Sequence, residues 1–193
     1  MISAAERIAA GSFRVSELVC SHIAGRAVPA VEHSHRLPVI YPATGEVVSE
    51  VQQADAEEVN AAVSAARDSF RAGVWRAMPV AERQRILRGI QALVRDNAAE
   101  LAFLECLAAG LPMAHLQRRQ VPRAAENFGF FADTIGQMAG ETFEQEQGYL
   151  TLVTREAAGV AALVAPWNAP LALASMQLAS CLAFGNSCVL KHA

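Results

Sequence analysis

Two polar side chains near the end of the sequence, Asn168 and Lys191, stand where a ligand could be bound. Asn168 follows a Pro-Trp pair directly after an apolar run that begins at Gly159, and Lys191 ends a second apolar run that begins at Ser187. If both runs are parallel strands, the two side chains lie beyond the carboxyl ends of the strands, where open α/β sheets bind ligands. An amide and an ammonium at that edge are therefore candidates for ligand recognition.

The elements that would position these residues form one strand, helix, strand unit over residues 159–193. The first run lacks alternation, which indicates a parallel strand buried on both faces. Pro170 stands at a helix start, and small residues continue to Phe184 before a Gly185-Asn186 turn and the second strand. Parallel strands require such a crossover. The fingerprint G-x-G-x-x-G is absent from the first turn, so these residues alone do not indicate a standard dinucleotide site.

Upstream of this unit the sequence predicts short strands followed by helices. We expect a helix over residues 3–10, a hairpin from Leu18 to Val28 with a turn at Gly25, and a second hairpin over residues 38–48 with a Pro42 to Gly45 turn. Asp55, with Glu58 three residues later, resembles a capping box and predicts the start of an amphipathic helix on which Val59, Val63, Ala66 and Phe70 share one face.

Further helices are expected as far as residue 140. Pro79 opens a helix whose apolar face carries Ile86, Ile90, Leu93 and Val94, while Arg83, Arg85, Arg88 and Arg95 lie mainly elsewhere. This helical stretch continues to Gly110 with a break near Asp96-Asn97. A last helix is expected over residues 113–137, kinked by Pro122, with Phe128, Phe131 and Ile135 on its apolar face and Gly140 at its end.

The pattern then changes at Tyr149, where residues 150–155 alternate with the period of a strand. The sequence therefore predicts an α/β protein, in which a helical amino-terminal region leads into the first βαβ unit of an incomplete parallel sheet. We divide the chain into a region of hairpins and helices over residues 1–140, a strand segment over 141–157, and the start of a nucleotide-binding domain over 158–193.

Composition excludes several functional classes. The 193 residues are 53% hydrophobic and carry a formal net charge of −3, so we expect a folded chain and no nucleic-acid partner. The four cysteines form no C-x-x-C pair and are expected to be packed in the core, and we predict no metal site. Charged residues interrupt the first apolar stretch, which argues against a signal peptide and favours a cytoplasmic protein. The apolar run from Leu171 to Phe184 is too short to span a membrane.

From about Ile23 onward the chain resembles the aldehyde dehydrogenase family. The similarity is carried by several motifs in the family's order, which are the Pro42-Ala-Thr-Gly turn, the Asp55 helix, Trp75, Pro79-Val-Ala-Glu-Arg, Leu104-Glu-Cys-Leu with Gly110, Thr154-Arg-Glu, Pro166-Trp-Asn, and Gly185-Asn186 before Val189-Leu-Lys. The resemblance implies a Rossmann-like NAD(P)-binding domain, an oligomerisation role for the strand segment, and oxidation of a small-molecule aldehyde or semialdehyde to a carboxylic acid with NAD or NADP. Residues around Tyr149 and Ala169 are similar to members that act on semialdehydes from aromatic breakdown.

The resemblance also implies roles for individual residues. Asn168 matches the family asparagine whose amide stabilises the oxyanion; the alternative is that Asn168 only caps the following helix. Lys191 matches the lysine that binds the adenosine ribose, against the alternative of a solvated lysine. Ala165, Pro166 and Trp167 match positions that border the nicotinamide, although Trp167 could equally be a core residue.

The sequence departs from the family pattern at Tyr41, at Ala108-Ala-Gly-Leu and at His192, none of which touches the chemistry directly. The family's cysteine nucleophile and glutamate base have no match among these residues. We therefore expect a fragment of an NAD(P)-dependent aldehyde dehydrogenase that is inactive alone and whose full-length form is a homo-oligomer. The alternative is a short, non-catalytic interaction protein that pairs with full-length subunits.

Overall fold

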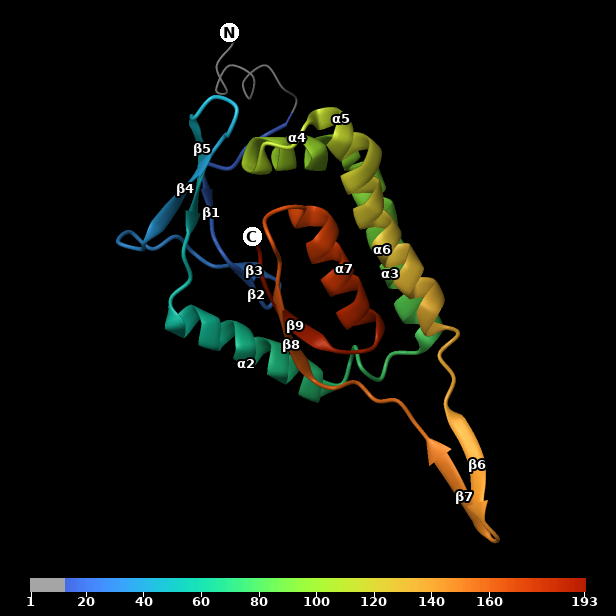
Figure 1. The fold of residues 1–193 in the computed structure, drawn as a ribbon. Coiled ribbons are helices and arrows are strands. Elements are labelled where there is room, and N and C mark those ends of the chain that lie inside the picture. Colours follow the sequence, from blue (N-terminus) through green and yellow to red (C-terminus); the bar gives the residue numbers. More distant parts are fainter. Residues whose placement is uncertain (1–12) are drawn as a thin grey trace.

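The computed structural model describes residues 13–193, so the helix predicted over residues 3–10 lies outside the described part of the chain. The strands are β1 (Leu18–Val19), β2 (His22–Ile23), β3 (Arg26–Ala27), β4 (Arg36–Ile40), β5 (Val47–Gln52), β6 (Glu141–Glu146), β7 (Tyr149–Val153), β8 (Val160–Val164) and β9 (Ser187–Lys191). The helices are α2 (Ala56–Ala72), α3 (Val80–Asp96), α4 (Ala98–Ala109), α5 (Met113–His115), the π-helical turn η1 (Leu116–Gln120), α6 (Val121–Ile135) and α7 (Pro170–Ala183). Figure 1 shows their arrangement.

Both predicted amino-terminal hairpins are confirmed. β2 and β3 pair antiparallel around a turn in which Ala24 and Gly25 both have positive φ, as a tight hairpin requires. β4 and β5 pair antiparallel, and the backbone N–H of Gly45 donates to the carbonyl of Tyr41 at 2.8 Å to close their turn. The first hairpin is shorter than predicted, because its expected first strand began at Leu18, whereas Leu18 and Val19 form β1, which runs parallel to β5 at the edge of that sheet.

The helix α2 begins as predicted, but its capping box is only half formed. The side chain of Asp55 accepts a hydrogen bond of 2.8 Å from the backbone N–H of Glu58. The reciprocal bond is absent, because Glu58 Oε1 is buried without a partner among the described residues. One capping bond is nevertheless enough to satisfy an otherwise unpaired donor of the first turn.

The long helical region is broken at the predicted positions and ends earlier than predicted. Asn97 separates α3 from α4. The single kinked helix expected around Pro122 is three segments, because the wide π turn η1 stands just before Pro122 and accommodates a residue that has no N–H. The prediction that Gly140 ends this helix is wrong, since α6 ends at Ile135. Gly140 instead meets the hairpin, where an added Cβ would lie 2.6 Å from the carbonyl oxygen of Val153.

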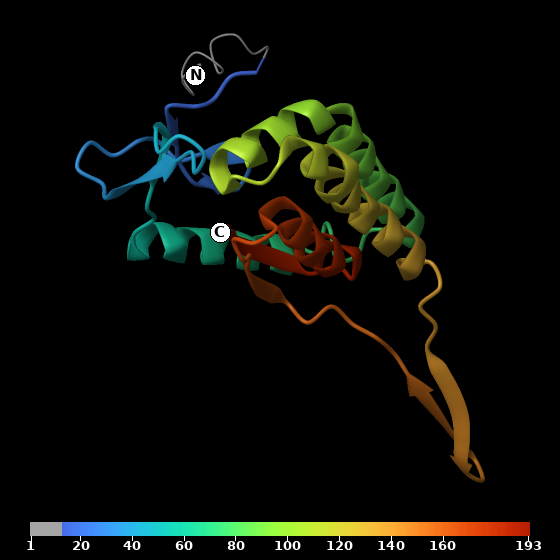
Figure 2. The ribbon, with the colours of Figure 1, turned by 45° about the horizontal axis from the view of Figure 1, so that its top comes forward.

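β6 and β7 form an antiparallel hairpin that projects away from the body of the molecule (Figures 1 and 2). The sequence indicated only the second strand. β6 was missed because every residue from Glu141 to Glu146 is exposed, so that no apolar face marks the strand.

The βαβ unit is confirmed, with β8 and β9 parallel and joined by α7. Their register runs from Val160 opposite Ser187 to Val164 opposite Lys191. Helices α2 and α7 both contact this two-stranded sheet, and α7 also packs on α6 (Figures 1 and 2). The prediction that β8 is buried on both faces is wrong, since Val164 is 64% exposed. Within residues 13–193 the two helices leave this end of the strand uncovered.

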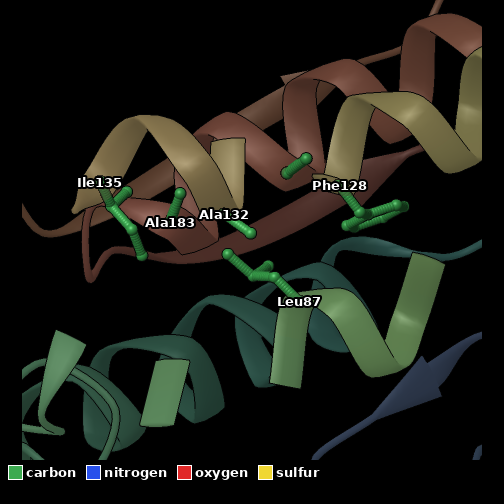
Figure 3. Packing of buried hydrophobic residues seen from close by; sticks show 6 residues of the cluster. Leu87, Phe128, Ala132, Ile135 and Ala183 are labelled. Carbon is green, nitrogen blue, oxygen red and sulfur yellow. The ribbon is translucent and has the colours of Figure 1, made fainter. Parts of the chain in front are cut away.

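The main core lies where α3, α6 and α7 meet. It consists of Leu87, Phe128, Ala132, Ile135, Ala179 and Ala183, most of which are labelled in Figure 3. Phe128 and Ile135 were predicted to face the core, and Phe131 packs against the same cluster. The alanines of α7 let its backbone approach α3 and α6 closely, as the run of small residues predicts.

The predicted face of α3 is partly wrong. Leu93 is 62% exposed, whereas Leu87 is fully buried. Arg83, which we placed mainly off the apolar face, lies one turn before Leu87 and is only 8% exposed. The core face of α3 is therefore rotated toward Arg83 and Leu87, because α6 covers that side together with the end of α7.

The buried Arg83 holds the carboxyl end of α7. Its guanidinium donates to the carbonyl of Ala183 at 3.1 Å and to three carbonyls of the loop before α3, those of Trp75, Arg76 and Met78, at 3.0 to 3.1 Å. The indole N–H of Trp75 donates to the carbonyl of Leu182 at 2.9 Å. Carbonyls at the end of a helix lack partners within the helix and carry partial negative charge, so a cation and a second donor satisfy them there.

We predict that Arg83→Ala lowers the free energy of unfolding by about 3 kcal/mol, because it leaves buried carbonyls without donors. Urea denaturation followed by circular dichroism measures the change. Arg88→Ala is the matched control on the same helix, since Arg88 pairs with Asp133 at an exposed position. The control is expected to cost less than about 1 kcal/mol. Equal losses in the two variants would contradict the role assigned to Arg83.

Candidate functional site

The candidate site lies at the carboxyl ends of β8 and β9. Val164 and Lys191 are opposite one another in the sheet, and the backbone N–H of Ala165 donates to the carbonyl of Lys191 at 2.9 Å. This hydrogen bond extends the pairing one residue beyond β8, so that the Pro166-Trp-Asn turn starts beside Lys191. The structure thus places Ala165, Pro166, Trp167, Asn168 and Lys191 at one edge of the sheet, as the sequence predicted.

The side chains of the turn point into open space. Ala165 is buried, but Pro166, Asn168 and Lys191 are exposed, and Trp167 is 80% exposed. Trp167 is therefore not part of the core formed by the described residues. An exposed indole at this position is available to border a ligand.

The alternative in which Asn168 caps α7 is also wrong. The residue at the cap position of α7 is Ala169, and no side chain at that position hydrogen-bonds to the first turn. Within the described part of the chain, the Asn168 amide makes no hydrogen bond to another residue. An exposed and unengaged amide remains free to donate to a ligand.

Two side chains from other elements hold the backbone on either side of the turn. The Gln177 amide, from α7, donates to the carbonyl of Val164 at 3.1 Å. The Glu105 carboxylate, from α4, accepts from the backbone N–H of Leu171 at 3.1 Å. The turn that carries Asn168 is thus anchored before its first residue and after its last.

Asn186 bonds to the backbone at the amino end of the strand pair, opposite the candidate site. Its Oδ1 accepts from the backbone N–H of Gly159 at 3.0 Å, and its Nδ2 donates to the carbonyl of Cys181 at 3.4 Å. The preceding Gly185 has a φ of 82°, which a residue with a side chain rarely adopts. The Gly185-Asn186 turn therefore fixes the start of β9 against the start of β8, and with it the register that places Lys191 beside Ala165.

Glu105 is a site residue that sequence reasoning missed. It is 7% exposed, and burial raises the pKa of its carboxyl above the ordinary value while the hydrogen bond from Leu171 acts in the opposite direction. A signal was present, since Glu105 is a lone charge in the apolar stretch Leu101–Ala109. A carboxylate in such a stretch is almost never fully buried unless it has a partner.

The two cysteines of the βαβ unit are packed, as predicted, and burial also keeps them poorly ionised. Burial is the main cause that raises the pKa of Cys181 to about 11, with the neighbouring thiol of Cys188 contributing. Burial raises the pKa of Cys188 as well. Because the thiolate is the reactive form, neither residue has the properties of a nucleophile.

Other features of the described residues do not add to this site. A pocket of about 320 Å³ lies elsewhere, among residues that include Tyr41, Phe103 and Gly110. Residues 13–193 contain no group of three or more His, Cys, Asp or Glu side chains that could hold a metal ion. In the same part of the chain, no helix has the length and apolar character needed to cross a membrane.

The parallel pair β8 and β9, the crossover helix α7 and the turn beyond β8 define a Rossmann-like α/β unit of the kind that binds ligands at its strand ends. The model of the aldehyde dehydrogenase family matches residues 30–193. The chain therefore belongs to the aldehyde dehydrogenase family.

Individual relatives agree with this assignment. The chain is 39% identical over 150 residues to 5-carboxymethyl-2-hydroxymuconate semialdehyde dehydrogenase from Escherichia coli, and the aligned residues cover 78% of this chain and 32% of the relative. It is 36% identical over 163 residues to human retinal dehydrogenase 2, covering 84% of this chain and 32% of the relative. An NAD+ complex of aldehyde dehydrogenase from Bacillus cereus superposes with a TM-score of 0.86 at 32% identity, covering 91% of this chain and 36% of that one. The chain thus spans about a third of the length of the proteins it matches.

We predict that Cys181 resists alkylation in the folded chain. A shift of the pKa from 9.0 to about 11 lowers the thiolate fraction near neutral pH about a hundredfold, in addition to the effect of burial. Iodoacetamide labelling followed by peptide mass spectrometry measures the rate, and the same chain in urea is the control. Labelling of Cys181 at equal rates in the native and unfolded states would contradict this prediction.

Proposed function

We propose that this chain supplies the amino-terminal part of an NAD(P)-dependent aldehyde dehydrogenase, which oxidises an aldehyde to a carboxylic acid. The observation that carries the proposal is the pairing of β8 with β9, which brings the turn with Asn168 beside Lys191. The family assignment supports it. The alternative of a non-catalytic interaction protein is not favoured by the family assignment.

Asn168 is proposed to stabilise the oxyanion. Its amide is exposed, is not used to cap α7, and has no hydrogen bond to the described residues. A preorganised neutral donor lowers the free energy of a transition state in which a carbonyl oxygen gains negative charge. The anchoring of the turn by Gln177 and Glu105 supports this role, because it holds the backbone that carries the amide and so reduces the reorganisation needed during the reaction.

Lys191 is proposed to bind the ribose of NAD or NADP, with Ala165, Pro166 and Trp167 bordering the nicotinamide. The residues fit this group, because an exposed ammonium stands at the end of β9 and an exposed indole stands in the adjacent turn. When bound, the dinucleotide would accept the hydride that leaves the aldehyde carbon after a nucleophile has added to the carbonyl. The chain's own contribution is to recognise the ribose and to orient the nicotinamide toward Asn168.

A semialdehyde is the proposed substrate class. The E. coli relative that is 39% identical acts, by its name, on 5-carboxymethyl-2-hydroxymuconate semialdehyde. That agreement supports the resemblance noted around Tyr149 and Ala169. The catalytic nucleophile and general base are proposed to come from outside residues 1–193, so that these residues alone are inactive.

The hairpin of β6 and β7 is proposed to be an oligomerisation segment of a cytoplasmic homo-oligomer. It projects from the body of the molecule (Figures 1 and 2) and exposes large apolar side chains, including Tyr149 at 70%, Leu150 at 67% and Leu152 at 63%. Large apolar side chains that gather on one exposed element can mark a protein interaction site. The proposed segment over residues 141–157 contains both strands of this hairpin.

We predict that Asn168→Ala lowers kcat about a hundredfold to a thousandfold, as the loss of one oxyanion donor does. The assay uses a chimera that joins residues 1–193 to the remaining two thirds of the E. coli relative, and follows the absorbance of the reduced nicotinamide.

Lys191→Ala in the same chimera is expected to raise KM for the dinucleotide about tenfold, through loss of one hydrogen bond.

Gln137→Ala is the control, since Gln137 is exposed at the end of the α6 region and far from this turn in the sequence. It is expected to leave both constants unchanged. The proposal fails if Asn168→Ala retains the kcat of the parent chimera, or if the parent chimera folds and binds no dinucleotide.

A further inference from the structure

The amino end of α7 lacks a cap of its own. Pro170 opens the helix and has no N–H, so the backbone N–H of Leu171 is the first donor that needs a partner. Ala169, at the cap position, has no side-chain acceptor and makes no capping bond. Helix starts normally carry Ser, Thr, Asp or Asn at that position.

Glu105 of α4 supplies the missing acceptor from 66 positions away in the sequence. Its Oε1 accepts from the N–H of Leu171 at 3.1 Å, and its side chain is more than nine-tenths buried. The positive end of the helix dipole favours a carboxylate at this position. Oε2 has no hydrogen-bond partner among the described residues, so the bond to Leu171 is the one that orients this group.

The position of this bond connects Glu105 to the candidate site. Leu171 is three residues after Asn168, and Gln177 holds Val164 on the other side of the same turn. The turn between those two anchors has no other side-chain hydrogen bond within residues 13–193. Loss of the bond to Leu171 would therefore release the helical end of the turn while leaving the strand end in place.

We propose that Glu105 is a positioning residue that sets the orientation of Asn168 by capping α7 from a neighbouring helix. The catalytic meaning of this orientation rests on the proposed function of Asn168, whereas the positioning itself does not. Glu105 touches neither substrate nor dinucleotide in this account. It acts through the backbone of the first turn of α7.

The test uses ¹⁵N nuclear magnetic resonance on the 193-residue chain. Glu105→Met keeps the length of the side chain and removes the acceptor. We expect the amide of Leu171 to exchange with solvent at least about tenfold faster, and the side-chain amide of Asn168 and the indole N–H of Trp167 to shift. Glu105→Gln retains an acceptor oxygen and is expected to restore both readouts, which a merely space-filling role for residue 105 would not require.

Glu100→Gln is the matched control, because Glu100 lies in the first turn of the same helix and makes no hydrogen bond within the described part of the chain. It should leave the Leu171 and Asn168 signals unchanged. The amides of Gly159 and Asn186, at the far end of the βαβ unit, report whether each variant keeps its fold. Glu105→Leu provides a second variant without an acceptor should the methionine variant not fold.

The proposal is overturned if an acceptor-free variant keeps the Gly159 and Asn186 signals and also keeps the parent exchange rate at Leu171 and the parent resonance of Asn168. It is equally overturned if Glu105→Gln behaves as Glu105→Met does. These readouts require no catalysis. If the chimera showed no enzyme activity, the resonance measurements on Glu105 would still decide the positioning role. If the resonance measurements contradicted that role, the kinetic test of Asn168 would be unaffected.

Discussion

The placement of the βαβ unit on the amino-terminal helices depends on how the two ends of α7 are satisfied. This helix is packed between the strands and α6, and backbone groups at both of its ends bond to side chains from the amino-terminal helices. Glu105 binds the first turn, where the dipole is positive, and Arg83 with Trp75 binds the last carbonyls, where it is negative. Each buried charge is placed at the end of opposite polarity, which offsets part of the cost of burying it.

This arrangement makes the helical region a support for the strand ends. Arg83 comes from α3 and Glu105 from α4, and neither helix belongs to the βαβ unit that they hold. Because α7 is fixed at both ends, the residue before it and the strand after it are fixed as well. Asn186 then aligns the two strands so that Lys191 ends beside Ala165. The amino-terminal helices thus contribute to the candidate site without supplying a residue that faces it.

Much of this architecture could be predicted from local sequence. The βαβ unit, both hairpins and the helix breaks follow from periodicity and from turn residues that act over a few positions. Asn168 and Lys191 became candidates through their place at strand ends, whereas Ala165, Pro166 and Trp167 and the roles of all five residues came from the family resemblance. What could not be predicted depends on contacts distant in sequence. The burial of Arg83 and Glu105 required knowledge that α7 packs beside them, some 100 and 66 positions away. β6 has no buried face to mark it, and Leu93 lies on a face that no described element covers.

The central claim is that Asn168 and Lys191 belong to one dinucleotide site formed by the ends of β8 and β9. A crystal structure of the chimera with NAD+ tests it most directly. The account predicts that the dinucleotide lies across those strand ends, with Lys191 Nζ within hydrogen-bond distance of a ribose hydroxyl and the Asn168 amide on the nicotinamide side. A dinucleotide bound away from β8 and β9, for instance in the pocket beside Tyr41, would contradict the account.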